Sequence, residues 1–225
     1  MGRFATRSLL ALPLAALVAV ALPAGASATH KPGHGQSPGA TDVTIAAQPT
    51  SIVYGSGSVF SGRLRAADNA GKTLELWADG YPFGGGEARV ATALTTSSGS
   101  YSVTRRPGRN TNYHVRYGAF RSASVLVNVR FRMSVSVSDA TPRAGSLVRF
   151  SGRACPASDG AVVSIQRRTS TGSYRTVART ALRAATRCSV YRRSIRVRSD
   201  GTYRVTTDDA ARARGYSRAR FLDAH

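Results

Sequence analysis

The stretch Phe60-Ser61-Gly62-Arg63 recurs as Phe150-Ser151-Gly152-Arg153, 90 positions later. Other positions are related by the same offset: Gly55-Ser56 and Gly145-Ser146, Tyr101 and Tyr191, Tyr113 and Tyr203, and the alternating sets Val43, Ile45, Ala47 and Met133, Val135, Val137. One register that fits several separate patches indicates an internal repeat. We therefore predict one small domain used twice, repeat 1 over residues 42–130 and repeat 2 over residues 131–225.

Both repeats consist of short alternating segments separated by turn residues, without helical periodicity. The strands predicted in repeat 1 cover residues 43–47, 59–64, 74–78, 88–95, 101–105, 113–117 and 125–129. Those predicted in repeat 2 cover residues 132–138, 147–153, 161–167, 174–182, 190–197, 202–207 and 217–222. Seven short strands at this spacing predict an all-β fold with two tandem immunoglobulin-like β-sandwich domains.

The last strand fits the repeat only with a further shift of six residues, which pairs Phe120, Ala123 and Leu126 with Tyr216, Ala219 and Leu222. The extra residues are assigned to a loop at 208–215, where an insertion costs little.

The N-terminus is typical of an export signal. Arg3 and Arg7 precede an apolar run from Leu9 to Leu22, and Ala26-Ser27-Ala28 offers small residues for cleavage. A membrane anchor is the alternative, but the run is short for a span of about 20 residues. We predict a cleaved signal peptide over residues 1–28, a disordered lead over residues 29–41 and no transmembrane segment in the mature chain. We therefore expect an extracellular protein. Any association with a cell wall would be non-covalent.

The chain is strongly basic, with a formal net charge of +21. Residues 130–225 contain twenty basic and six acidic side chains, whereas residues 42–129 contain nine and five. Such a surface attracts nucleic acid, acidic polysaccharide or anionic cell-wall polymer. The alternative is codon bias, because all basic residues except Lys31 and Lys72 are Arg.

Strand alternation gives candidate anion-binding residues in repeat 2. Tyr203 and Val205 are expected to face inward, and so are Ala219 and Phe221. Arg204, Arg218 and Arg220 alternate with these residues and are therefore expected to face outward. Together with Arg196 and Arg198 they form the candidate set of anion-binding residues. A solvated arginine-rich face is the alternative interpretation.

Three aromatic residues around one loop of repeat 1, Trp77, Tyr81 and Phe83, could stack on sugars. Trp77 alternates out of phase with Leu74 and Leu76, which favours exposure. A lone Trp in a small sandwich is, however, more often a core or rim residue.

Cys155 follows the second strand of repeat 2, and Cys188 precedes the fifth. Those two strands are antiparallel neighbours in an immunoglobulin-type sandwich, so their adjoining ends bring both Cys together. An exported chain meets an oxidising compartment, and we therefore predict a disulfide.

No catalytic pattern is evident. There is no Gly-x-Ser-x-Gly elbow, and His114, between Tyr113 and Val115, is expected to point to solvent. His30 and His34, or Asp208 and Asp209, would make only weak metal sites. We predict a protein that is not an enzyme and has no cofactor or metal.

The turn Gly-Ser-x-x-x-Phe-Ser-Gly-Arg and the Gly-Ser-Tyr, Pro and Asn-Thr-x-Tyr elements of residues 99–113 resemble those of secreted proteins of high-GC Gram-positive bacteria that carry tandem immunoglobulin-like domains. The resemblance covers about residues 42–222 and implies a spacer, display or adhesion module. The expected function is thus a secreted structural or interaction protein that contacts an anionic polymer, a cell-surface polysaccharide or a protein partner through repeat 2. Carbohydrate binding through Trp77 is the alternative.

Overall fold

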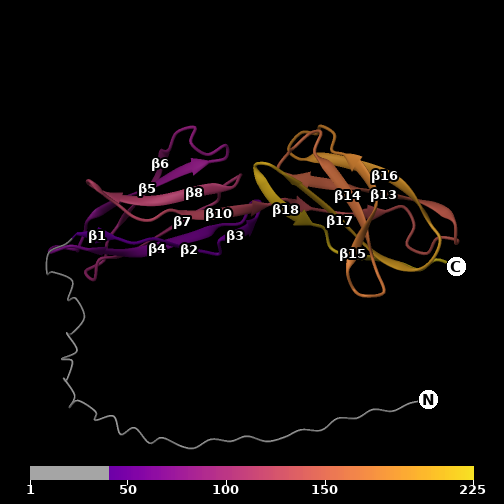
Figure 1. The fold of residues 1–225 in the computed structure, drawn as a ribbon, viewed down its shortest axis with the longest axis horizontal. Helices are drawn as coiled ribbons and strands as arrows, with labels where there is room; N and C mark the ends of the chain where they lie inside the picture. The colour runs from indigo at the N-terminus through magenta and orange to yellow at the C-terminus, as the bar shows by residue number, and fades with distance from the viewer. Residues whose placement is uncertain (1–40) are drawn as a thin grey trace, which may run out of the picture. The chain divides into compact units, whose positions relative to one another are not determined.

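The computed structural model describes residues 41–225, and their regular secondary structure is entirely β-strand (Figure 1). The all-β prediction is confirmed. The predicted signal peptide and all but the last residue of the predicted lead lie outside the described residues.

Repeat 1 consists of two sheets. The first joins four strands: β1 (Asp42–Val43), β2 (Ala46–Gln48), β4 (Ser58–Arg65) and β7 (Ser100–Arg105). The second has the order β6-β5-β8-β10-β3, with β9 on β8: β3 (Ser51–Val53), β5 (Thr73–Gly80), β6 (Ala88–Leu94), β8 (Thr111–Tyr117), β9 (Phe120–Arg121) and β10 (Val125–Arg130).

Repeat 2 follows the same plan. Its first sheet joins β11 (Arg132–Met133), β12 (Ser136–Val137), β13 (Ser146–Cys155) and β16 (Ser189–Val197). Its second sheet has the order β15-β14-β17-β18, with β19 also on β17: β14 (Val162–Arg168), β15 (Tyr174–Ala181), β17 (Gly201–Asp209), β18 (Arg212–Tyr216) and β19 (Arg220–Leu222).

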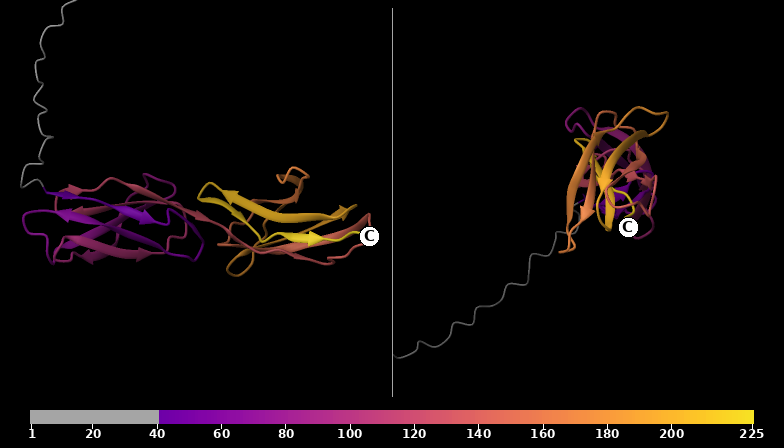
Figure 2. Two further views of the ribbon diagram at one scale, coloured as in Figure 1. Left: turned by 90° about the horizontal axis from the view of Figure 1, so that it is seen from below. Right: turned by 90° about the vertical axis from the view of Figure 1, so that its right-hand side faces the viewer.

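This connectivity is immunoglobulin-like. In each repeat the second and fifth predicted strands pair in one sheet. The third, fourth, sixth and seventh predicted strands form the other sheet. Figure 2 shows the strands of each repeat in two layers. The arrangement is that of a two-sheet sandwich with antiparallel neighbours from distant parts of the chain.

Each repeat encloses its own cluster of buried side chains, one from Val43 to Val129 and one from Phe131 to Leu222. Phe60 and Phe150 are both fully buried. Their rings pack against Tyr113 and Tyr203, at centroid distances of 4.3 Å and 5.4 Å. The positions that reveal the repeat in the sequence are therefore core positions.

Two further repeated residues make the same contact across the central strand of the first sheet in each repeat. The hydroxyl of Tyr101 donates a hydrogen bond to the Thr44 carbonyl at 2.6 Å, and Tyr191 donates to the Ser134 carbonyl at 2.7 Å. A Cβ atom on Gly152 would lie 2.2 Å from that Ser134 carbonyl oxygen. The Gly of the Phe-Ser-Gly-Arg stretch is thus required by the close approach of a neighbouring strand.

The predicted shift of six residues in the last strand is wrong. Ser122 and Ser217, 95 positions apart, each accept a hydrogen bond through their hydroxyl, from the amides of Val115 and Val205. The offset beyond the repeat is therefore five. Because side chains alternate along a strand, a slip of one residue reverses every side chain. Leu222 is fully buried, and Phe221, predicted to face inward, is 61% exposed.

Several elements differ from the predicted strands. The first predicted strand of each repeat is split in two, as β1 and β2 and as β11 and β12, and β9 was not predicted. The segment 208–215, predicted as a loop, is largely the β17–β18 hairpin, with Asp209 opposite Arg212. Strand β3 was not predicted, because it has only three residues and pairs in parallel with β10 near the far end of the repeat. Pairing between such distant segments leaves no local pattern.

Candidate functional site

Cys155 and Cys188 form a disulfide, with an S–S distance of 1.99 Å and Cα atoms 4.5 Å apart. Cys155 ends β13, and Cys188 immediately precedes β16, the antiparallel partner of β13. The bond fixes the C-terminal end of the exposed segment 183–187 at one end of this strand pair.

The five arginines expected to bind anions are distributed over two sheets. Arg196 lies in β16, and exposed Arg198 follows that strand. Arg204 lies in β17 and Arg220 in β19, with Arg218 between β18 and β19. The outer faces of the two sheets of a sandwich point in opposite directions, so the structure does not gather the five on one surface.

Arg204 faces outward as expected, but it is held by aromatic rings. Its guanidinium carbon lies 3.8 Å from the Tyr174 ring centroid and 4.3 Å from that of Tyr216. Its Nε donates a hydrogen bond to Gln166 at 2.9 Å. Cation–π contacts of this kind tie together the strands of the second sheet.

Four exposed arginines instead line the outer face of the β13–β16 pair; we call Arg196, Arg149, Arg192 and Arg153 the arginine row. Val148 and Phe150 point into the core, so Arg149 and Arg153 point outward on β13. Arg196 lies opposite Leu147, and Arg192 lies opposite Ser151. Along the strand direction, Arg196, Arg149, Arg192 and Arg153 therefore lie level with positions 147, 149, 151 and 153 of β13, in that order.

The row has no acidic partner within the described residues. The ion pairs found there in repeat 2 are Arg212–Asp209 and Arg214–Asp208, both on the other sheet. The residues directly opposite the row are Leu147, Ser194, Ser151 and Val190, so no two arginines face each other across the ladder. This staggering limits the repulsion that directly opposed like charges would cause.

Shallow depressions lie at the disulfide end of the row. One, of about 420 Å³, is lined by Arg153, Arg183 and Arg192 with Ser151 and Val190. Another, of about 380 Å³, is lined by Arg153, Arg187 and Cys188. This surface was not predicted from the sequence, although Arg149/Arg153 and Arg192/Arg196 both show the four-residue spacing that places two side chains on one face of a strand.

The aromatic candidates of repeat 1 are not an open stacking platform. Trp77 is half-buried, and the Arg116 guanidinium carbon lies 4.4 Å from the centroid of its ring. Its indole nitrogen donates a hydrogen bond to Glu75 at 3.0 Å. Tyr81 and Phe83 pack edge to face, 5.6 Å apart. Phe83 is 44% exposed, the most accessible of the three.

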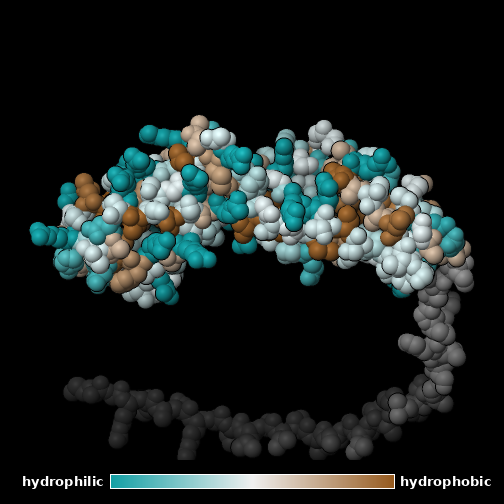
Figure 3. All heavy atoms as spheres, turned by 180° about the vertical axis from the view of Figure 1, so that it is seen from behind, coloured by the Kyte–Doolittle hydropathy of each residue, from teal (hydrophilic) through white to brown (hydrophobic). Residues whose placement is uncertain are grey.

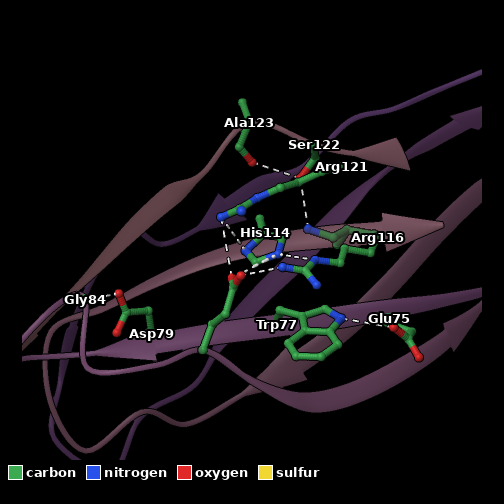
Figure 4. Close-up of polar contacts among 11 residues, drawn as sticks. Glu75, Trp77, Asp79, Gly84, His114, Arg116, Arg121, Ser122 and Ala123 are labelled. Carbon is green, nitrogen blue, oxygen red and sulfur yellow. Dashed lines mark hydrogen bonds and ion pairs between the residues drawn. The ribbon is translucent and has the colours of Figure 1, made fainter. Parts of the chain in front are cut away.

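His114 is buried rather than solvent-directed, with 3% of its surface exposed. Figure 4 shows it beside Trp77 and between Arg116 and Arg121. Arg116 donates through Nε to His114 Nε2 at 3.0 Å and also pairs with Glu87, whose carboxylate lies 3.3 Å from the same imidazole nitrogen. Burial, then Arg121, lowers the pKa of His114, whereas Glu87 opposes this shift. The expectation of exposure failed because these long charged side chains cover an outward position.

Beside this cluster, a depression of about 360 Å³ is lined by Asp79, Glu87, Asn112, His114 and Arg121 with neighbouring small residues. One carboxylate oxygen of Asp79 accepts a hydrogen bond from the Gly84 amide at 2.8 Å. Its other oxygen is buried without a hydrogen-bond partner among the described residues.

No group of three or more His, Cys, Asp or Glu side chains placed to hold a metal ion occurs within residues 41–225. In the same part of the chain, no helix has the length and apolar character needed to cross a membrane. On the face seen in Figure 3, hydrophobic residues form small patches interrupted by hydrophilic ones.

The fold is that of an all-β protein with immunoglobulin-like sandwiches. No family model and no curated protein matches the chain. Among solved structures, it is similar to a biofilm-associated protein BSP domain, with 12% identity, a TM-score of 0.30, and coverage of 80% of this chain and 29% of that one. It is also similar to the Yersinia pseudotuberculosis adhesin InvE, with 12% identity, a TM-score of 0.37, and coverage of 84% and 61%. The chain thus spans less than two thirds of either structure.

Proposed function

We propose that the protein is a secreted, non-catalytic interaction protein that binds an anionic polymer through the outer face of the β13–β16 sheet. The observation that carries this function is the arginine row, four exposed cations on one sheet face without an acidic partner in the described residues. The N-terminal signal pattern and the disulfide support an extracellular location, with non-covalent association to a cell surface.

Electrostatics supports binding to a polymer rather than to a single small ion. Several arginines that neutralise charges on one chain release its counterions together, so the affinity falls steeply with salt. Isolated exposed ion pairs are weak, which makes simultaneous contact along the row the source of affinity.

The test is binding of the purified protein to a polyanion such as polyphosphate, measured at two salt concentrations. Replacement of Arg149 and Arg153 by Gln should weaken binding and flatten the salt dependence. As the control, replacement of Arg175 and Arg179 by Gln removes the same charge from two exposed positions of β15, in the other sheet of repeat 2. If both double variants lose equal affinity, net charge alone binds the polymer and the proposed surface is wrong.

Carbohydrate binding through repeat 1 is the second candidate. The buried Asp79 oxygen without a partner favours it, because a sugar hydroxyl entering the adjacent depression would donate to it. Exposed Phe83 could contact the same ligand. Loss of glycan binding in Asp79→Asn or Trp77→Ala, with little effect of salt, would support this candidate over the first.

A further inference from the structure

The arginine row has a regular spacing. Successive members are displaced by two residues along the strand direction, which corresponds to about 6.7 Å per step. The row alternates between two strands about 4.8 Å apart, so its four charges describe a shallow zigzag about 20 Å long. An evenly spaced row of this kind fits a linear partner with one charge per repeating unit.

The side chains of the row favour phosphate as the charged group. A guanidinium presents a planar fork of donors that matches two oxygens of one phosphate, and it is weakly hydrated compared with an ammonium group. The step along the row is close to the separation of successive phosphates in an extended phosphodiester chain. Between the arginines lie Ser151 and Ser194, whose hydroxyls can hydrogen-bond to the units that join the phosphates.

The same face argues against a nucleic acid strand. Proteins that bind single strands without sequence preference stack the bases on aromatic side chains. The outward residues of β13 and β16 include Leu147, Val190 and the two serines but no aromatic residue. A chain without bases would leave no unstacked rings in water.

The disulfide end of the row carries one further basic residue, Arg183. Arg183 forms an isolated β-bridge with Val190, which itself lies opposite Arg153. With Arg192, Arg153 and Arg183 line the depression of about 420 Å³, so a fifth arginine adjoins the row at this end.

We infer that the arginine row binds an extended phosphodiester polymer without bases, of the polyol phosphate type, that lies along β13 and β16 with successive phosphates on successive arginines. This inference rests on the proposed function and specifies the partner of the same surface.

The first test is a length series of glycerol phosphate oligomers from two to eight phosphates, measured with the purified protein by calorimetry. Affinity should rise with each phosphate up to four or five, the number of arginines in the row with Arg183, and then level off. A polysaccharide with one carboxylate per disaccharide, at equal charge, should bind more weakly. Equal affinity for both polymers would overturn the phosphodiester inference but leave the proposed function intact.

Two further outcomes of the series are decisive. Oligothymidylate that binds as tightly as the glycerol phosphate oligomer of equal charge would make a nucleic acid strand the partner and overturn the inference. Absence of binding to every polyanion at low salt would overturn both the inference and the proposed function.

The second test keeps the net charge and breaks the spacing. The double substitution Arg192→Ser with Ser194→Arg moves one charge to a position directly opposite Arg149. We expect about a tenfold loss of affinity for the phosphodiester oligomer, as for one charge-assisted hydrogen bond. Unchanged affinity would contradict the inference. Circular dichroism verifies the fold, and the length series decides the question if this variant does not fold.

Discussion

Tyr101 and Tyr191 show how one side chain joins the strands of each sandwich. Their rings are buried, and burial raises the pKa of both hydroxyls well above the ordinary value. The hydroxyl groups therefore stay protonated and keep donating to the carbonyls of Thr44 and Ser134. Gly62 and Gly152 permit this approach because they lack a side chain.

Removal of one such hydroxyl should destabilise the sandwich that contains it. Tyr191→Phe keeps the ring but leaves the Ser134 carbonyl without this donor, so the free energy of unfolding should fall by about 1 kcal/mol. Denaturant unfolding measures the change. Tyr174→Phe, on the outer face, is the control, and an equal loss in both variants would refute the role of the buried hydroxyl.

His114 should make the stability of repeat 1 depend on pH. Its pKa is lowered in the folded protein, so the unfolded chain binds more protons at and below the ordinary pKa of about 6.5. The stability should therefore fall as the pH decreases through this range. Unfolding of the protein at pH 7.5 and 5.5 should show a smaller difference in His114→Gln than in the unchanged chain. An equal difference in both proteins would contradict this role of His114.

Among the secondary-structure elements, β13 and β16 form the longest strand pair, with nine paired positions. One face of the pair contributes Val148, Phe150 and Tyr191 to the core, and the other carries the arginine row. The inward side chains thus hold the register that spaces the outward charges. A register slip of one residue would move both sets to the wrong face.

The disulfide should stabilise this pair by restricting the unfolded chain. Its half-cystines are separated by 33 residues in the sequence. The loop-closure model gives a loss of about 3–4 kcal/mol when a loop of this size is opened. Thermal unfolding of the double variant Cys155→Ser, Cys188→Ser against the oxidised protein tests the value. An unchanged melting temperature would mean that the bond is not formed in the protein as isolated.

For the whole molecule, the division into residues 42–130 and 131–225 stays a prediction. Each part has its own cluster of buried side chains, and Phe131 belongs to the second. Its ring is almost fully buried, and its carbonyl oxygen would lie 2.2 Å from a Cβ atom on Gly215.

The boundary can be tested by truncation. A fragment of residues 131–225 should fold and retain its disulfide, because its core is complete. A fragment that starts at residue 132 lacks the Phe131 side chain and should be less stable by about 3–5 kcal/mol, as for loss of a buried Phe. Hydrogen exchange of both fragments measures the difference. Equal protection would show that Phe131 is not required by the second part.

The sequence by itself determined the fold class, the repeat and the disulfide partners. Phe60 and Phe150, with the paired tyrosines, occupy equivalent core positions, and core positions leave a pattern because alternation and burial act on every strand. The offset of 90 therefore reports equivalent packing directly.

Only the tertiary structure decided which outward residues lie together. The arginine row joins Arg149 and Arg153 to Arg192 and Arg196, about 40 positions away, through the β13–β16 register. The one-residue error at Phe221 and the burial of His114 have a related cause. Alternation assigns a side chain to a face, but its neighbours on that face come from strand pairing between distant segments, which no local pattern of residues encodes.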